Sequence, residues 1–234
     1  MPIYAIDESQ RKAARVAGLM YLFIIITANL VEFYVRRQII VRGDAMQTAR
    51  NIAASADLFR LGIAGDVAVL ACDIILIIAL YVLLKPINRH LALLAVFWRL
   101  IGCSMVAATI ANSVAALLIV GSLPTLSAEQ LPVFTRLLMS LDTGGNRVAA
   151  LFFGLGSTLF CYLWFKSRFV PRVLAGWGIF ASLVPAIVPL STVLLASLAD
   201  APLRRARAGI PIAIFEAAMG LWLLIKGVKQ PVVE

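Results

Sequence analysis

The chain has 234 residues, of which 62% are hydrophobic, and its formal net charge is +9. A soluble domain is roughly 45–50% apolar, so this chain has more apolar surface than a soluble fold can bury, as its mean hydropathy of +0.96 also indicates. Its basic residues stand in short clusters beside apolar runs, which favours contact with lipid headgroups and excludes the aromatic-interleaved basic stripe of a nucleic-acid-binding protein. The composition predicts one integral membrane domain, 1–234, that contacts membrane lipids and no nucleic acid.

Apolar runs long enough to cross a bilayer, which takes about 20 residues, recur along the chain. The predicted spans are residues 16–35, 61–84, 91–120, 147–165, 173–195 and 210–225. The first follows a basic segment but has no small-residue cleavage site after it, so we expect it to stay in the chain. Pro185 and Pro189 predict a kink or an unwound turn in the fifth. The expected fold is all-α, a polytopic transmembrane helical bundle with about six spans.

Two connections carry a pattern that begins short surface helices, a polar cap with glutamine three residues later. These are Asp44 with Gln47 and Ser127 with Gln130. Both follow odd-numbered spans, so both helices should lie on the same, extracytoplasmic side. The paired glycines Gly144 and Gly145 predict a break in the helix before the fourth span. Basic residues are divided almost evenly between the two faces, but all lysines lie on the face of the termini, which favours cytoplasmic termini.

Cysteine and histidine usage argues against metal and cofactor chemistry. Cys72, Cys103 and Cys161 all lie in apolar runs, and their odd number makes a disulfide framework improbable. The single histidine, His90, lies in a short polar loop, so a histidine-based zinc or haem site is not expected. The sequence carries none of the phosphate-loop, dinucleotide, nucleophile-elbow or zinc-protease motifs. We therefore predict no metal and no cofactor.

Charged residues inside the predicted spans are the most informative feature, because each costs about 2.5–3.5 kcal/mol at a helix centre and by default suggests a functional site. With a rise of about 1.5 Å per residue, Asp73 and Arg99 reach similar depths on either side of the turn at Pro86. This predicts a buried ion pair that joins the second and third spans. A purely structural pair without a ligand would have the same sequence pattern.

Other polar residues of the spans should lie nearer the face with the surface helices, where they could line one carboxylate-bearing pocket open to the extracytoplasmic side. The candidates are Glu32, Asp66, Asn112, Asn146, Arg147 and Glu216. Asp66 and Asp73 are seven residues apart and share a helical face, which would connect the pocket to the ion pair. Alternatively, each carboxylate pairs with a neighbouring arginine, as Glu32 could with Arg36. The segment from Ser140 to Arg147 could bind a lipid phosphate or another anion. A glycine-rich turn that joins two helices without a ligand would have the same sequence.

Several stretches, taken in order, resemble the bacterial membrane-protein family catalogued as domain of unknown function 4386. They are residues 11–19, 59–63 with Asp66 and Asp73, 81–89 around Pro86, Arg99, 152–155, and Glu216 with 221–228. The turn around Pro86 is the most specific of them. The resemblance implies a multi-pass protein of the bacterial inner membrane and brings no activity with it.

Three functions remain open at this point. Intramembrane carboxylates and a proline-bearing fifth span favour non-enzymatic binding or transport of a small or lipidic ligand through the pocket. A structural or assembly protein would use the same charges only for packing. An enzyme acting on lipid headgroups would need Asp66 or Glu216 as a base or magnesium ligand and Arg147 on the phosphate. The lack of a nucleophile motif argues against the enzyme.

Overall fold

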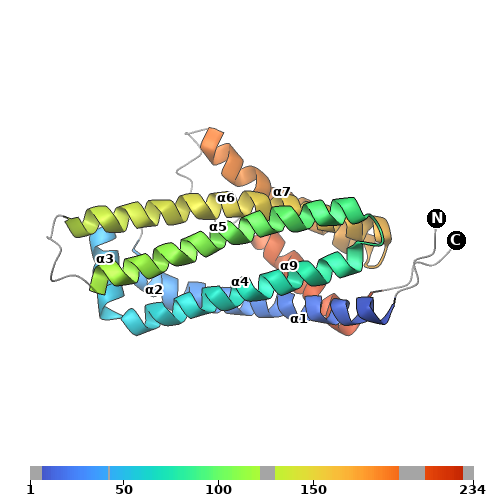
Figure 1. The fold of residues 1–234 in the computed structure, drawn as a ribbon, viewed down its shortest axis with the longest axis horizontal. Coiled ribbons are helices and arrows are strands. Elements are labelled where there is room, and N and C mark those ends of the chain that lie inside the picture. Colours follow the sequence, from blue (N-terminus) through green and yellow to red (C-terminus); the bar gives the residue numbers. More distant parts are fainter. Residues whose placement is uncertain (1–6, 42, 122–129, 195–208, 229–234) are drawn as a thin grey trace.

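The computed structural model describes residues 7–41, 43–121, 130–194 and 209–228, and the regular structure in this part of the chain is helical. The four longest helices, α1 (Glu8–Val31), α4 (Ala56–Leu84), α5 (Arg89–Gly121) and α6 (Gln130–Ser167), extend along the long axis of the molecule (Figure 1). Helices α7 (Arg172–Leu194) and α9 (Ile210–Ile225) complete the bundle. Each of these six helices contacts the next one in chain order, and α9 contacts α1, so they form a closed ring.

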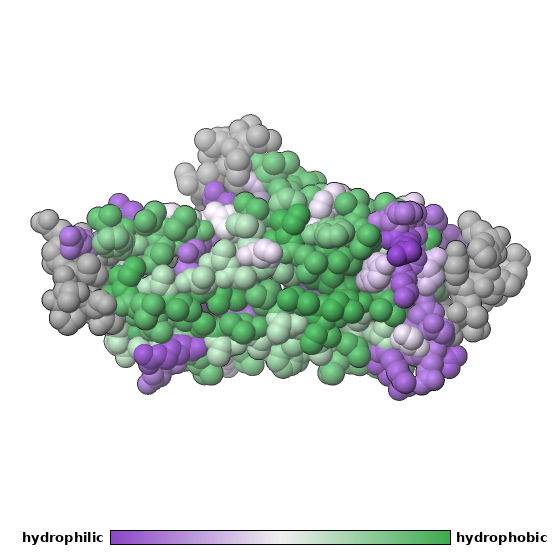
Figure 2. Space-filling model, viewed as in Figure 1, coloured by the Kyte–Doolittle hydropathy of each residue, from purple (hydrophilic) through white to green (hydrophobic). Residues whose placement is uncertain are grey.

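Five of the helical segments are long and apolar enough to cross a membrane. They are Glu8–Ile39, Ala56–Leu84, Arg89–Val120, Val133–Ser167 and Arg172–Ser191. Helix α9 coincides with the sixth predicted span but has only 16 residues, or about 24 Å at the α-helical rise. Hydrophobic side chains cover the middle of the molecule and hydrophilic ones gather toward its ends (Figure 2). The prediction of a helical membrane bundle is confirmed, and the chain is a multi-pass membrane protein.

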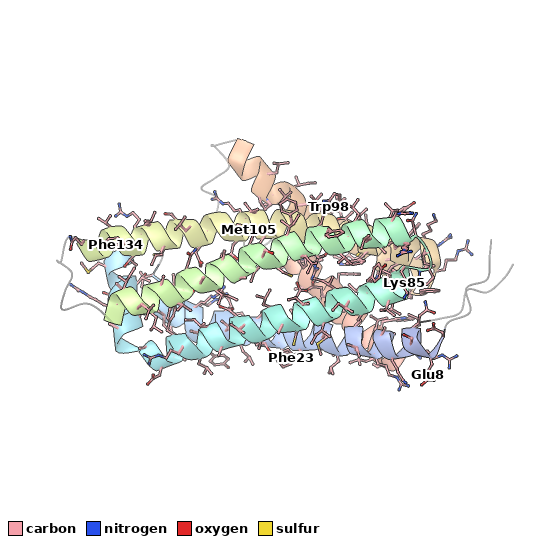
Figure 3. The ribbon with its side chains drawn as sticks, in the orientation of Figure 1. Glu8, Phe23, Lys85, Trp98, Met105 and Phe134 are labelled. Atoms are coloured by element: carbon pink, nitrogen blue, oxygen red, sulfur yellow. The ribbon has the colours of Figure 1, made fainter. Side chains whose placement is uncertain are left out.

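The two ends of the ring are built differently. Residues 85–88 join α4 to α5, residues 168–171 join α6 to α7, and both connections lie at the end where α1 begins, which we call the turn end (Figure 1). Glu8 and Lys85 lie there, whereas Phe134 lies at the opposite end (Figure 3). The short helix α3 (Ala45–Ala54) contacts α5 and α6 at that opposite end, which we call the pocket end.

Helix α3 is the first of the two predicted surface helices. The Asp44 carboxylate caps it by accepting a hydrogen bond from the backbone N–H of Gln47 at 2.8 Å. The preceding Gly43 has φ +85°, which suits glycine because a side chain is strained there. The buried residues of α3 are Thr48, Ala49 and Ile52. Helix α3 therefore packs onto the bundle rather than lying free on its surface.

The structure differs from the prediction at the glycine pair. Gly144 and Gly145 lie inside α6, which is continuous from Gln130 to Ser167. The predicted helix break is therefore wrong, and residues 130–147 continue the helix of the fourth span instead of forming a separate surface helix. A helical glycine costs only about 1 kcal/mol, and Gly145 allows α5 to approach closely, since a Cβ there would lie 2.8 Å from Cγ2 of Thr109. The cap predicted at Ser127 lies outside the described residues.

Other prolines and glycines lie within the helices of the bundle, and the glycines allow close helix packing. Helix α7 stays helical through Pro185 and Pro189, without the unwound turn that was considered. A Cβ on Gly154 of α6 would lie 2.7 Å from the carbonyl oxygen of Ser182 in α7, and one on Gly18 of α1 would lie 2.9 Å from a carbonyl oxygen of α9. Small residues thus let the backbones of neighbouring helices approach, as is common between helices in membranes.

Candidate functional site

Polar side chains gather at two levels of the ring. The first level, the interior cluster, contains Asp73 of α4, Arg99 and Cys103 of α5, Ser157 of α6 and Glu216 of α9. Asp73, Arg99, Ser157 and Glu216 each lie about nine to eleven residues from the turn end of their helix, or about 14–17 Å at the α-helical rise. The hydrocarbon core of a bilayer is about 30 Å thick, so the interior cluster lies near the middle of the membrane.

Arg99 is the centre of the interior cluster. It is 3% exposed, and its guanidinium donates to the carboxylate of Asp73 and, at 2.7 Å, to the hydroxyl of Ser157. The thiol of Cys103 donates to the other oxygen of Asp73 at 3.2 Å. The guanidinium also lies 4.2 Å from the centre of the Phe153 ring, a cation–π distance. The structure thus brings together the two residues expected to form a buried ion pair, and adds a third helix through Ser157.

Gly156 makes this arrangement possible. A Cβ at this position would lie 2.7 Å from Cγ of Arg99 and 2.9 Å from the carbonyl oxygen of Ala95. Both distances are shorter than van der Waals contact, so the stem of the arginine occupies the space that any side chain on α6 would need. Gly156 therefore provides the space that the Arg99 side chain occupies. The sequence analysis did not identify this glycine.

Glu216 belongs to the interior cluster rather than to a pocket near the surface. It shares a face of α9 with the buried residues Gly220 and Leu223, four and seven positions later. It interacts electrostatically with Arg99 and Asp73. The sequence analysis predicted a position nearer the pocket end, although it gave the sixth span the same bounds as α9. Because α9 has only 16 residues, Glu216 lies at the level of Arg99.

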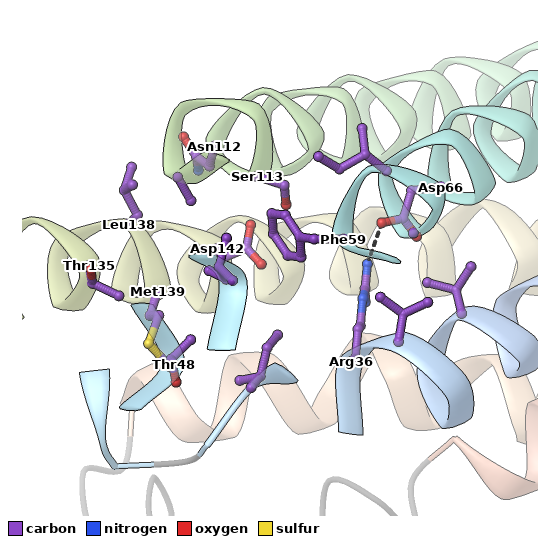
Figure 4. Close-up of a pocket in the computed structure, with 17 residues that line it drawn as sticks. Arg36, Thr48, Phe59, Asp66, Asn112, Ser113, Thr135, Leu138, Met139 and Asp142 are labelled. Atoms are coloured by element: carbon purple, nitrogen blue, oxygen red, sulfur yellow. Dashed lines mark hydrogen bonds and ion pairs between the residues drawn. The ribbon is translucent and has the colours of Figure 1, made fainter. Parts of the chain in front are cut away.

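The second level lies at the end of the ring opposite the turn end. It is a cavity, which we call the end pocket (Figure 4). It is partly open to the surroundings. Arg36 and Asp66 form an ion pair in it at 2.7 Å. The lining residues are Val31, Val35, Arg36, Ile40, Thr48, Ile52, Phe59, Gly62, Ile63, Asp66, Asn112, Ser113, Ala116, Thr135, Leu138, Met139 and Asp142.

Asp142 is a site residue of the end pocket that the sequence analysis missed. Its side chain extends from α6 into the end pocket (Figure 4). Its Oδ1 atom is buried and accepts no hydrogen bond, and the carboxylate interacts electrostatically with Arg36 and Asp66. Thr135 and Asp142 are seven residues apart and share a face of α6. That spacing is visible in the sequence, although the sequence analysis did not place Asp142 in a pocket.

Of the predicted pocket residues, Asp66 and Asn112 line the end pocket, and the others do not. Glu32 is half-exposed, and its carboxylate lies 3.9 Å from Arg37. It does not pair with Arg36, which pairs with Asp66. The change of partner occurs where the first helix passes into a π-helical turn, η1 (Glu32–Arg36), followed by α2 (Arg37–Ile39). This turn alters which side chains face α4.

Asn146 and Arg147 do not line the end pocket. The amide of Asn146 is exposed and donates to the backbone oxygen of Asp142 at 2.9 Å. Arg147 lines a separate shallow groove with Arg136, Ser140 and other residues of α6 and of the start of α3. The backbone around Gly144 is helical, so the glycine-rich loop considered as a phosphate site is not formed. Among the described residues, no group of three or more His, Cys, Asp or Glu side chains could hold a metal ion.

Comparison with known proteins gives one match. Residues 16–227 match the model of the family described as Domain of unknown function (DUF4386). No curated protein and no solved structure matches the chain.

Proposed function

Since the chain belongs to the family described as Domain of unknown function (DUF4386), whose description names no activity, we propose a function from the residues of the end pocket: the protein binds a small amphiphilic cation there. The observation that carries this proposal is the carboxylate of Asp142. It lies in an apolar pocket with one oxygen buried and without a hydrogen-bond donor. A buried charge of this kind is costly unless an opposite charge or a donor joins it.

The charges of the end pocket do not balance. Arg36 contributes one positive charge, and Asp66 neutralises it through the ion pair at 2.7 Å. Asp142 adds a second carboxylate that interacts with both of them. With both carboxylates ionised, the pocket carries one excess negative charge, which an occupant with one positive charge would neutralise. An anionic occupant would increase the imbalance.

The remaining lining favours a ligand with an apolar body. Aliphatic and aromatic side chains form most of the pocket wall, among them Ile52, Phe59 and Leu138. Asn112 and Thr48 add a few polar groups that could orient the ligand. Ligand pockets commonly combine an apolar wall with a few fixed polar groups. The ligand class that fits is a cation with a hydrophobic body.

The position of the pocket supports access from outside the hydrocarbon core. Asp142 lies about 25 residues from the turn end of α6, or about 38 Å at the α-helical rise. This exceeds the roughly 30 Å of a hydrocarbon core, so the pocket lies at the level of the lipid headgroups. With cytoplasmic termini in a bacterial inner membrane, as the lysine distribution favours, the pocket opens toward the extracytoplasmic side.

Binding of a lipophilic cation tests the proposal. Labelled tetraphenylphosphonium is equilibrated by dialysis with the protein in lipid nanodiscs, for the wild type and for Asp142→Asn. We expect saturable binding that weakens at least tenfold in the variant, which corresponds to about 1.4 kcal/mol. Glu32→Gln is the matched control, because it removes the same charge from a side chain that does not line the pocket. Equal affinity in wild type and Asp142→Asn, or no saturable binding to the wild type, would refute the proposal.

The two alternative functions make different demands on the same residues. A purely structural protein should lose abundance, and no separate activity, when Asp142 is neutralised. An enzyme acting on headgroup phosphates would need a base close to Arg147. Asp66 is instead engaged by Arg36, and Glu216 lies at the other level of the ring. The end pocket therefore supports binding better than catalysis.

A further inference from the structure

The interior cluster has an imbalance of its own, independent of the end pocket. Arg99 supplies one positive charge, whereas Asp73 and Glu216 supply two negative charges when both are ionised. Arg99 and Asp73 are joined directly. Glu216 forms no hydrogen bond or ion pair with any described residue, although it interacts electrostatically with both members of the pair. Near the middle of a membrane, a carboxylate without a direct partner is expensive.

A second observation concerns a buried donor of Arg99. Arg99 is 3% exposed, yet its Nε–H donor is buried without an acceptor. Buried donors in native proteins are nearly always satisfied by protein groups or by ordered water. Arg99 therefore keeps one donor beyond those that Asp73 and Ser157 engage.

The titratable neighbours of Glu216 come from four other helices. The groups that interact with it electrostatically are Tyr21 of α1, Asp73 of α4, Arg99 of α5 and Cys161 of α6. Helix α7 contributes Ser182, whose hydroxyl lies 3.8 Å from the Cys161 thiol and carries no charge. Arg99 is the one cation in this set, and Asp73 already neutralises it. A single added positive charge is what makes the set neutral.

The coordination chemistry favours a proton over a metal cation. Hard metal cations require several oxygen ligands around one point. Both oxygens of Asp73 already accept hydrogen bonds, one from Arg99 and one from Cys103. Glu216 alone would remain to supply carboxylate oxygens, which is too few for a metal site but sufficient for a proton.

We propose that the interior cluster is a proton-binding site in which Glu216 takes up and releases the proton. Uptake forms one O–H bond on a carboxylate oxygen of Glu216, with water as the donor, and release returns the proton to water. Arg99 and Asp73 remain paired and hold the electrostatic surroundings of Glu216 constant. Proton exchange at this depth is typical of relay carboxylates in membrane proteins. The site needs no ligand in the end pocket, so it goes beyond the function proposed above.

Infrared difference spectroscopy of the protein in lipid nanodiscs tests this assignment. A protonated carboxylic acid gives a C=O stretching band that a carboxylate lacks. In the wild type we expect such a band to disappear reversibly as the pH is raised from acid to alkaline. Glu216→Gln should abolish that band, and the control Glu32→Gln should retain it, because Glu32 is half-exposed and lies outside the cluster.

A second measurement keeps the test decisive if Glu216→Gln does not fold. Incorporation of glutamate with a ¹³C side-chain carboxyl into the wild type should shift the band, whereas labelled aspartate should leave it in place. A band that persists in Glu216→Gln, that shifts only with labelled aspartate, or that is absent from the wild type would overturn the proposal. So would a titration that occurs with sodium chloride but not with choline chloride, since it would identify a sodium site. Tetraphenylphosphonium is absent throughout, so failure here is separate from failure at the end pocket.

Discussion

Replacing Asp73 by asparagine should lower the free energy of unfolding by about 3 kcal/mol. Removing one partner of a buried ion pair costs about 3–5 kcal/mol, because the other charge stays buried without compensation. The partner left behind is Arg99, which is 3% exposed and cannot reach water without moving the helices around it. The lower end of the range applies, since Ser157 still accepts from Arg99.

The measurement is equilibrium unfolding in mixed micelles with increasing sodium dodecyl sulfate, followed by the fluorescence of the four tryptophans. Trp164 is fully buried and should report the loss of the core. Glu32→Gln should change the free energy by less than about 1 kcal/mol, as is usual for an exposed ion pair. Adding Arg99→Gln to Asp73→Asn should restore part of the loss, because both charges are then gone. An Asp73→Asn protein as stable as the control would refute the reasoning.

Three further outcomes follow from the contacts. Gly156→Ala should destabilise the protein by about 1–3 kcal/mol in the same unfolding assay, because its methyl group would overlap Arg99; wild-type stability would contradict this packing. Asp44→Ala should cost about 0.5–2 kcal/mol through loss of the α3 cap, with increased hydrogen exchange confined to α3 as the check. Arg36→Gln should strengthen tetraphenylphosphonium binding, opposite in sign to Asp142→Asn, because it makes the end pocket more negative; weaker binding would argue against a cation site.

Residue numbers predicted the relative depth of side chains correctly where a tight turn links two helices. The connection at Pro86 holds the ends of α4 and α5 at the same level, so residue numbers on each side convert directly into depth. That is why the sequence could place Asp73 beside Arg99. The apolar runs likewise located the long helices, because length and hydropathy are local properties of the chain.

The sequence was less informative where tertiary contacts decide the structure. The sequence around Gly145 predicts a helix break, but α6 continues through it. The absence of a side chain at Gly145 lets α5 pack closely against α6. Asp142 then lies on the pocket face of a continuous helix rather than in a loop. The depth of Glu216 depended on where α9 begins within the bundle, which hydropathy does not specify.

The two levels repeat one arrangement of charge. At each level an arginine from a neighbouring segment pairs with an aspartate of α4: Arg36 with Asp66 and Arg99 with Asp73. The aspartates are seven residues apart and share one helical face. Each pair also has a further carboxylate in electrostatic reach, Asp142 in the end pocket and Glu216 in the interior cluster. Because α4 carries a member of both pairs, a shift of this helix along its axis would strain both ion pairs together. A positive charge arriving at either level would meet one unneutralised carboxylate, so the proposed ligand and the proposed proton would bind by the same electrostatic principle, and α4 is the element through which one could influence the other.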